Sequence, residues 1–458
     1  MVFQATLAQV AAAIAAKPFH LPPKILNKTV SGISTDTRTL KPGQIFLALK
    51  GDSFDGHQFL SIARDRGATA AIVSAPKGVP DGFPYLQVGD TLHAYQQLAH
   101  WWRNHLGLPI VAITGSVGKT TTKELIAAAL GTQGRILKTE ANHNNEIGVP
   151  KTLLTLTPDH SYGIIEMGMR GPGEIALLSQ IAAPTVGVIT NVGTAHIGRL
   201  GSEQAIAEAK CELLAEMPAG STAVLNADNA RLMKTAATVW QGRQLTFGLS
   251  SGDICGQYHD APDGASLTLE GLSIPLPLPG EHNALNYLAA IAVMQTLNLD
   301  WTVLAQGLTV TLPPGRAKRL ELPNDIVVLD ETYNAGFESM VAALKLLATL
   351  PGERRIAVLG TMKELGSQSQ RLHHCVGETA AQLGIHQLLV LAEPVEADAL
   401  QTGAAGIPST AFASRAQLGA ALQQMVKPGD RVLFKASHSV GLNQVVTEFA
   451  QSLLPLAD

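Results

Sequence analysis

The residues best suited to chemistry lie in a glycine-rich loop between an apolar strand and a helical segment. The loop follows the apolar run 109–115 and consists of Gly115, Ser116, Val117, Gly118, Lys119, Thr120 and Thr121. Backbone N–H groups in such a loop point inward, and the positive end of the next helix adds to their attraction for phosphate. Lys119 has the reach to contact β- and γ-phosphates, and the Thr120 hydroxyl is a ligand for Mg²⁺. The loop therefore predicts binding of a nucleoside triphosphate.

The loop is shorter than the standard phosphate loop. Ile113 stands where the first glycine of the eight-residue pattern would lie. A tight strand-to-helix turn with an incidental lysine is the alternative interpretation. The order of strand, loop and helix favours phosphate binding.

Two further residues follow apolar strands and are candidates to bind a metal ion near the loop. Glu166 ends the run 162–168, and His196 follows the run 185–193. Parallel strands deliver such side chains to the crevice at their carboxyl ends. A lone histidine is equally consistent with a structural role. Lys210 lies in the helical segment 202–217, whose polar positions predict an exposed face, and spacing alone would make it one more solvated charge.

Three polar clusters could bind ligands, although each could instead form turns or caps. The stretch 139–154 contains Asn142, Asn144 and Asn145, which suit a polar, glycan-like ligand as well as a turn. The other two clusters follow strands near the end of the chain, where an open α/β sheet binds ligands. Their members are Asp330, Glu331, Tyr333 and Asn334 in one, and Lys435, Ser437 and His438 in the other.

These residues are spread over a chain whose pattern predicts an α/β fold. Apolar runs of strand length alternate with helical patterns, which favours largely parallel sheets. A run rich in proline and glycine ends near Gly89, and the double proline in 311–318 resembles a hinge. We therefore expect three domains, 1–89, 90–313 and 314–458, with the helix that follows Gly89 belonging to the second.

Composition excludes several classes of protein. The 458 residues are 46% hydrophobic and 15% charged, as in a globular protein with several cores. Thirty-three basic and 37 acidic residues give a net charge of −4, unlike a dedicated nucleic-acid binder. Three scattered cysteines form neither a disulfide framework nor a zinc pattern. With no apolar run long enough to span a membrane and no secretory signal at the start, we expect a cytoplasmic protein.

The ordered motifs resemble the Mur ligases, ATP-dependent amide ligases that build the peptide of the peptidoglycan precursor. The resemblance runs from about residue 30 to residue 450 and includes GSVGKTTT, TEANHNNEIGVP, IIEMG, NVGTAHIGRLGS, PGEHNALNYLAA and PPGR. The flanking motifs VSGISTDTRTLKPGQIFLALKGDSFDGHQF, DETYNAGFESM and VLGTMKELGSQSQRLHHCVGE resemble the type that adds D-alanyl-D-alanine to UDP-N-acetylmuramoyl-tripeptide. The resemblance implies a small N-terminal α/β domain, a central P-loop-type ATPase domain and a Rossmann-like C-terminal domain, in a monomer.

The resemblance also implies roles for individual residues. Besides the loop, the residues expected to bind ATP are His282, Asn283, Asn286, Arg316 and Asp330. Two Mg²⁺ ions would be held by Thr120, Glu166, His196 and Lys210, the last as a carbamate. The UDP-linked substrate would contact Thr35, Asp36, Arg38, Asn142, Asn144 and Asn145. The incoming dipeptide would contact Tyr333, Asn334, Lys435, Ser437 and His438.

The implied reaction requires two anions to approach each other. A substrate carboxylate attacks the γ-phosphate of ATP to give an acyl phosphate, which the amino group of the dipeptide then attacks, expelling phosphate. Lys119 and two Mg²⁺ ions would neutralise the repulsion between the carboxylate and the γ-phosphate in the first step. Closure of the third domain would keep water from the acyl phosphate.

Three departures from the family pattern lie in the third domain. This chain has Gly336-Phe337 where Asn-Pro is usual, Thr361 where Asp is usual, and His438 where Arg is usual. The last replaces a permanent bidentate cation by a group that is mostly neutral at pH 7. The alternatives are another Mur-type ligase, such as the one that adds the third amino acid or a polyglutamate ligase, and a nucleotide-binding homologue without activity.

Overall fold

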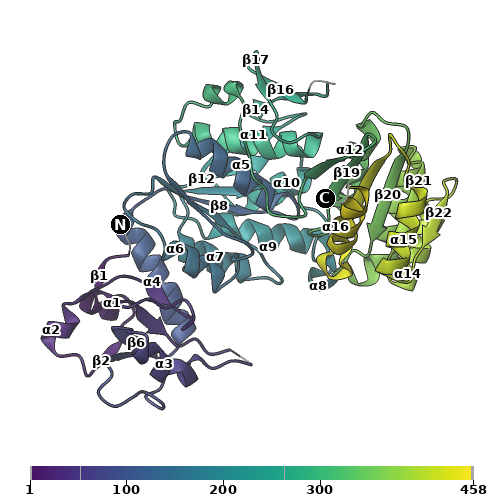
Figure 1. Cartoon of the computed structure of the whole chain (residues 1–458). Helices are drawn as coiled ribbons and strands as arrows, with labels where there is room; N and C mark the ends of the chain where they lie inside the picture. The colour runs from purple at the N-terminus through teal and green to yellow at the C-terminus, as the bar shows by residue number, and fades with distance from the viewer. Residues whose placement is uncertain (1–2, 52, 262–263, 455–458) are drawn as a thin grey trace.

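The computed structural model describes residues 3–51, 53–261 and 264–454 and forms three α/β units in chain order. Figure 1 shows the N-terminal unit in purple, the central unit in blue to green and the C-terminal unit in green to yellow. The α/β class predicted from the sequence is confirmed. The long helix α4 (Thr91–Leu106) joins the first unit to the second and packs on two helices of the second, α6 (Gly148–Leu153) and α7 (Glu174–Ala182).

The N-terminal unit is a five-stranded sheet covered on both faces. Its strand order is β2 (Lys17–Phe19), β7 (Tyr85–Gln87), β6 (Ala70–Val73), β5 (Ile45–Leu47) and β4 (Ile33–Ser34). Only β2 runs antiparallel to its neighbour. Alternate residues of β5 enter different cores, since Phe46 packs with α3 (Leu60–Asp65) and its neighbours with α1 (Leu7–Ala13). Strands β1 (Ala5–Thr6) and β3 (Thr29–Val30) form a separate antiparallel pair.

The central unit has a seven-stranded sheet that is parallel throughout. The strand order is β14 (Ile254–Cys255), β13 (Arg243–Gly248), β12 (Thr222–Asn226), β11 (Val186–Ile189), β8 (Ile110–Thr114), β10 (Tyr162–Glu166) and β9 (Ile136–Lys138). A parallel sheet must be covered on both faces, which explains the continuous apolar runs of its strands. An antiparallel hairpin sheet, β15 (Gln257–His259), β16 (Ser266–Leu269) and β17 (Leu272–Pro275), follows it in the chain.

The two faces of the central sheet carry different helices. Val111 and Ile113 of β8 share a core with α5 (Lys119–Gly131) and α11 (Glu281–Thr296). Ile110 and Ala112 face the other way, toward α4, α7 and α9 (Glu203–Ala215). Because α5 begins directly after the glycine-rich loop, this packing fixes the loop at the carboxyl end of the central strand β8. Helices α8 (Ile197–Leu200) and α10 (Ala230–Val239) complete the unit.

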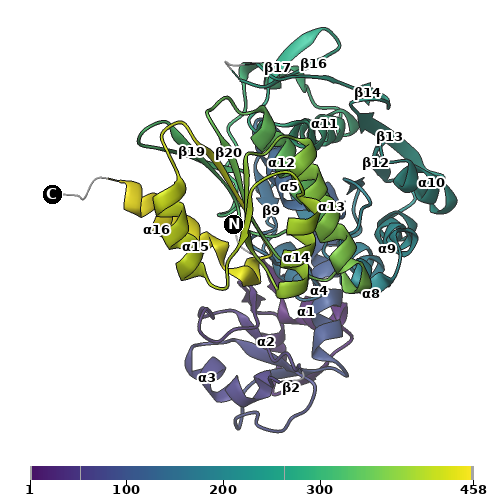
Figure 2. The ribbon, with the colours of Figure 1, turned by 90° about the vertical axis from the view of Figure 1, so that its right-hand side faces the viewer.

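The C-terminal unit is a six-stranded, Rossmann-like sheet. The strand order is β18 (Lys318–Leu322), β19 (Ile326–Glu331), β23 (Arg431–Lys435), β20 (Arg355–Gly360), β21 (Gln387–Leu391) and β22 (Ser409–Ala411), with only β18 antiparallel. One face is covered by α12 (Phe337–Thr349), α13 (Ser369–Gln382) and α14 (Pro394–Gly403), and the other by α15 (Arg415–Met425) and α16 (Leu442–Leu453). Figure 2 shows both layers. Within the part of the chain that the structure describes, no helix has the length and apolarity to cross a membrane.

Candidate active site

A cavity of about 910 Å³ is lined by residues of the central and C-terminal units. The central unit contributes the glycine-rich loop and the residues that follow β9, β10 and β11. The C-terminal unit contributes residues that follow β19, β20 and β23, together with the first turns of α12. The carboxyl ends of parallel strands from two sheets therefore meet at one cavity, as open α/β sheets require for ligand binding.

The glycine-rich loop has a backbone that only glycine tolerates at two positions. Gly115 and Gly118 have φ angles of +156° and +81°. A Cβ atom at Gly118 would lie 2.7 Å from Oδ1 of Asn286 on α11, and one at Gly115 would collide with the Thr190 hydroxyl. The loop is thus held close against two neighbouring elements, with the N-terminus of α5 facing the cavity. This geometry suits a bound anion.

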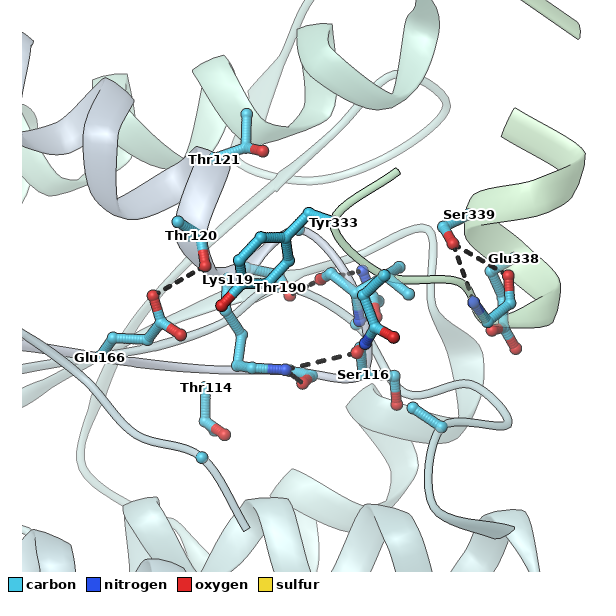
Figure 3. Close-up of a pocket in the computed structure, with 18 of the residues that line it drawn as sticks. Thr114, Ser116, Lys119, Thr120, Thr121, Glu166, Thr190, Tyr333, Glu338 and Ser339 are labelled. Atoms are coloured by element: carbon cyan, nitrogen blue, oxygen red, sulfur yellow. Dashed lines mark hydrogen bonds between the residues drawn. The ribbon is translucent and has the colours of Figure 1, made fainter. Parts of the chain in front are cut away.

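Lys119 turns back over the loop that precedes it. Its ammonium donates hydrogen bonds to the carbonyl oxygens of Gly115 at 2.8 Å and Ser116 at 3.4 Å, as Figure 3 shows. Desolvation lowers the pKa of Lys119, and the nearby carboxylate of Glu166 opposes that shift. The cation is therefore placed among backbone carbonyls and beside the loop, ready for exchange onto phosphate oxygens.

Thr120 and Glu166 form a cluster of oxygen atoms beside Lys119. The Thr120 hydroxyl donates to Oε2 of Glu166 at 2.9 Å (Figure 3). The Asn144 amide donates to Oε1 of the same carboxylate at 2.9 Å. The buried ammonium of Lys123 lies 3.9 Å from Oε2 and donates to the Thr139 carbonyl oxygen. A hydroxyl and a carboxylate oxygen at the end of a phosphate loop are the hard ligands that Mg²⁺ prefers. These residues fit a divalent cation.

His196 lies at the start of α8 in the left-handed backbone region, with φ of +66°. Its Nδ1 is 2.6 Å from Oε2 of Glu364, a residue of the C-terminal unit, although the angle between them is not that of a well-aligned hydrogen bond. Burial lowers the pKa of His196, and Glu364 opposes the shift. The imidazole is therefore neutral near pH 7, which is the form that binds metal ions.

Lys210 is buried in α9, with 1% of the residue exposed. The spacing-based expectation of a solvated charge is wrong, because this side of α9 packs into the unit and Lys210 faces the cavity. Among the described residues, none pairs with its ammonium by an ion pair or a hydrogen bond. Burial, with Lys119 nearby, lowers the pKa of Lys210 well below its usual value. Of the acidic residues expected on the exposed face of α9, Glu208 and Glu216 are exposed, whereas Glu203 and Glu212 are half-buried.

Three of the residues expected to bind ATP, His282, Asn283 and Asn286, lie at the start of α11 and line the cavity. Asn286 donates to Oδ1 of Asn283 at 3.3 Å and accepts from the Thr122 hydroxyl at 3.0 Å. This network ties α11 to α5. Burial, with Lys435 as a smaller influence, lowers the pKa of His282 to about 4, so its imidazole is neutral.

The C-terminal unit places a second group of polar side chains on the cavity. The Arg316 guanidinium stacks 3.8 Å above the ring centroid of Tyr333. The buried Lys435 ammonium donates to the Asn334 carbonyl oxygen at 3.1 Å and lies 3.8 Å from Oε2 of Glu331. Burial lowers the pKa of Lys435 and raises that of Glu331. Ser437 and His438 also line the cavity.

Four predicted site residues do not line this cavity. Asp330 is buried and accepts a hydrogen bond from the Thr332 hydroxyl at 2.6 Å, while the next residue, Glu331, lines the cavity. Thr35, Asp36 and Arg38 belong to the N-terminal unit. The Arg38 guanidinium donates to Oδ2 of Asp36 at 2.7 Å, and these hydrogen bonds lower the pKa of that carboxyl. The remaining predicted residues, including the three asparagines, line the cavity.

Sequence reasoning missed Glu338, in the first turn of α12. Its carboxylate accepts from the backbone N–H of Thr194 at 2.6 Å and from the Thr194 hydroxyl at 3.3 Å, which links the two units at the cavity wall. Figure 3 shows Glu338 and Ser339 on this wall. Its partner is 144 residues away, and an acid in the first turn of a helix is otherwise an ordinary helix-terminal charge. No local signal distinguishes it.

Comparison with known proteins agrees with this architecture. Three family descriptions match: "Mur ligase family, catalytic domain" over 29–103, "Mur ligase middle domain" over 113–294, and "Mur ligase, glutamate ligase domain" over 315–438. A UDP-N-acetylmuramoyl-tripeptide–D-alanyl-D-alanine ligase from Synechocystis is 56% identical over 92% of both chains.

Two solved structures share the whole fold. A crystal structure of MurF from Acinetobacter baumannii is 30% identical, with a TM-score of 0.89 over 98% of this chain and 99% of that one. A MurF ligase from Thermotoga maritima in complex with ADP, also 30% identical, has a TM-score of 0.83 over 92% of this chain and 97% of that one. The chain belongs to the Mur ligase family.

Proposed function

We propose that this chain is an ATP-dependent ligase that joins D-alanyl-D-alanine to UDP-N-acetylmuramoyl-tripeptide. The 56% identity with the Synechocystis ligase, which extends over 92% of both chains, carries the proposal. The cavity supports the proposal, because the residues proposed to bind phosphate, the metal ions and the incoming dipeptide all line it. Synthesis of a nucleotide-linked precursor of peptidoglycan belongs in the cytoplasm, so we assign the protein to that compartment, and we propose that it acts as a monomer.

The reaction begins with attack of the tripeptide carboxylate on the γ-phosphate of ATP, which yields an acyl phosphate and ADP. The Lys119 ammonium exchanges its carbonyl partners for phosphate oxygens and offsets the repulsion between the two anions. The loop N–H groups and the N-terminus of α5 hold the phosphate chain in place. His282, Asn283 and Asn286 hold the base at the start of α11.

The second step joins the dipeptide. Its amino group attacks the acyl carbonyl carbon, and the tetrahedral intermediate expels phosphate to leave an amide. Tyr333, Asn334, Lys435, Ser437 and His438 lie on the C-terminal wall, where they would bind the dipeptide. Closure of the C-terminal unit over the cavity would keep water from the acyl phosphate. Thr35, Asp36 and Arg38 would hold the uridine end of the acceptor in the N-terminal unit, with Asn142, Asn144 and Asn145 along the path to the cavity.

Two Mg²⁺ ions would be held by Thr120, Glu166 and His196, with Lys210 completing the set as a carbamate. When bound, they would add positive charge around the transferring phosphoryl group. A neutral amine is the form that reacts with CO₂, and the lowered pKa of Lys210 increases its population at neutral pH. A carbamate would give this buried position the negative charge that a metal ligand needs. The proposal for Lys210 rests on its burial at the cavity and the lack of an ionic partner among the described residues.

The three departures in the C-terminal unit bear on selection of the dipeptide. Thr361 accepts a hydrogen bond from the Glu393 N–H at 3.0 Å, so its hydroxyl helps to shape the loop after β20. His438 lies 6.1 Å from Tyr333 between ring centroids. Of the changed residues, Gly336 and His438 line the cavity, so these two bear directly on a site for a small dipeptide. Retention of Lys119, Glu166, His196 and Lys210 argues against a homologue without activity.

Phosphate release tests the proposal. ATP, Mg²⁺ and UDP-N-acetylmuramoyl-tripeptide are supplied with D-alanyl-D-alanine or with single amino acids. We expect release only with the dipeptide. Lys119→Ala should lower the rate by at least about 10²-fold and retain binding of the UDP-linked substrate, whereas Lys234→Ala, an exposed lysine on α10, should leave it unchanged. Release with a different amino component would refute the dipeptide assignment, and a near-normal rate in Lys119→Ala would refute the role of the loop.

A further inference from the structure

The segment that follows β20 docks on α8 and reaches His196 from the other unit. The backbone N–H of Gly198 donates to the carbonyl oxygen of Glu364 at 3.0 Å. The Glu364 carboxylate then lies between two side chains of the central unit, with Oε2 at 2.6 Å from Nδ1 of His196 and Oε1 at 3.2 Å from the Arg199 guanidinium. One residue of the C-terminal unit therefore contacts α8 through both its backbone and its side chain.

The backbones meet so closely that two glycines are required. A Cβ atom on Gly198 would lie 2.5 Å from the Gly366 nitrogen and 2.8 Å from the Glu364 carbonyl oxygen. Gly366 itself has a φ of +55°. The contact is thus backbone against backbone, which leaves no room for any side chain at position 198.

Both residues of the His196–Glu364 pair have left-handed backbones, with φ of +66° and +65°. This region is uncommon for residues other than glycine, and such residues concentrate at functional sites. These two residues are the ones whose side chains meet between the units.

A carboxylate on Nδ1 is the arrangement that prepares a histidine to bind a metal ion. Once aligned as a hydrogen bond, this 2.6 Å contact would fix the tautomer with the proton on Nδ1, orient the ring and leave the Nε2 lone pair free. Here the carboxylate comes from the unit across the cavity.

We propose that Glu364 is a positioning residue that orients His196 for metal binding, and that it does so only when the C-terminal unit is docked on α8. The inference rests on the proposed function, in which His196 is a metal ligand. Docking of the C-terminal unit and completion of the metal site then become one event. The reaction would begin only when the wall that excludes water is in place.

Two variants and one control test the inference, and two further variants grade the effect. Glu364→Ala removes the carboxylate, and Gly198→Ala keeps both side chains but blocks the backbone approach. Glu378→Gln is the matched control, because Glu378 forms a similar pair with His374, 3.7 Å away on the exposed surface of α13. Binding of Mn²⁺ is followed by electron paramagnetic resonance of the free ion, with full-length enzyme, the UDP-linked substrate and a non-hydrolysable ATP analogue.

We expect wild type and Glu378→Gln to bind two Mn²⁺ ions. In Glu364→Ala and Gly198→Ala, the affinity for the more weakly bound Mn²⁺ ion should fall by about tenfold or more. The Mg²⁺ concentration that gives half-maximal turnover should rise by a similar factor. Glu364→Gln, which keeps an acceptor oxygen, should lie between. His196→Ala should lose the same ion.

If the wild-type enzyme turns over but Glu364→Ala or Gly198→Ala binds Mn²⁺ as tightly as wild type, the inference about Glu364 is overturned. The proposed function would then still stand. The proposed function would instead fail if wild type released no phosphate with D-alanyl-D-alanine. The same loss of affinity in Glu378→Gln would also overturn the inference, because the effect would then not depend on the His196 contact.

Discussion

At the scale of single residues, Lys210 offers the sharpest test of the chemistry. If its carbamate supplies a carboxylate-like ligand, Lys210→Ala should lose turnover by at least about 10²-fold, because charge stabilisation of that size is lost. Acetate or another short carboxylic acid should restore part of the rate by occupying the vacated space. Phosphate release against acid concentration measures the effect.

Lys119→Ala is the control for that rescue. This variant lacks a positive charge, which a carboxylic acid cannot supply. Equal rescue of both variants would show a general effect of the acid. A Lys210→Ala enzyme that no acid rescues at any concentration would contradict the carbamate.

His282 should make the stability of the protein depend on pH. Its pKa is about 4 in the folded protein, against about 6.5 when unfolded, so the unfolded chain binds more protons between these values. The free energy of unfolding should therefore fall as the pH drops from about 6.5 to 4. Because His282 borders a cavity open to water, we expect a loss of about 1–2 kcal/mol.

Urea unfolding at pH 7 and pH 4.5, for wild type and His282→Gln, measures the contribution. The glutamine variant should show a smaller fall over this range. Equal falls in both proteins would mean that His282 is not held neutral by the fold.

Residue types predict some of this site and not the rest. Lys119 and Thr120 could be identified because the loop has a recognisable order of glycines, lysine and threonine. Lys210 could not, because its chemistry follows from burial, and spacing alone predicts a solvated charge. Glu338 and Glu364 carry no local pattern, since each acts on a residue of another unit.

At the scale of elements, the rule that ligands bind at the carboxyl ends of parallel strands placed most side chains correctly. It failed by one residue at β19, where Glu331 rather than Asp330 lines the cavity. Successive side chains of a strand point to opposite faces. In a strand that is buried on both faces, polar and apolar residues do not alternate, so the sequence does not indicate which side chain faces the cavity.

The packing of α11 against the start of α5 should limit what the loop tolerates. Gly118→Ala would place a Cβ atom 2.7 Å from Oδ1 of Asn286 and force a non-glycine residue to φ of +81°. We expect a loss of about 1–3 kcal/mol in the free energy of unfolding and weaker ATP binding. Gly131→Ala, at the other end of α5 with open space around it, should be neutral or slightly stabilising.

Urea unfolding and nucleotide titration of the two alanine variants measure this contrast. If Gly118→Ala were as stable as Gly131→Ala and bound ATP normally, the close approach of α11 to the loop would affect neither stability nor ATP binding.

At the scale of the whole molecule, alternating strands and helices predicted the α/β class. The run rich in proline and glycine before Gly89 and the double proline in 311–318 predicted three units. Neither could predict how the units meet, because the contacts of Glu338 with Thr194 and Glu364 with His196 join residues far apart in the chain. Figures 1 and 2 show the C-terminal unit beside the end of the central sheet where the loop lies. The cavity exists only through that arrangement.

The most direct test of the account follows the oxygen atoms of the acceptor. UDP-N-acetylmuramoyl-tripeptide with both oxygens of its reacting carboxylate labelled with ¹⁸O is incubated with ATP, Mg²⁺ and D-alanyl-D-alanine, and the products are analysed by mass spectrometry. An acyl phosphate requires one labelled oxygen to leave with phosphate and the other to remain in the new amide. We predict one ¹⁸O in each released phosphate and one in each ligated product. Phosphate without label, or label without a ligated product, would contradict the account.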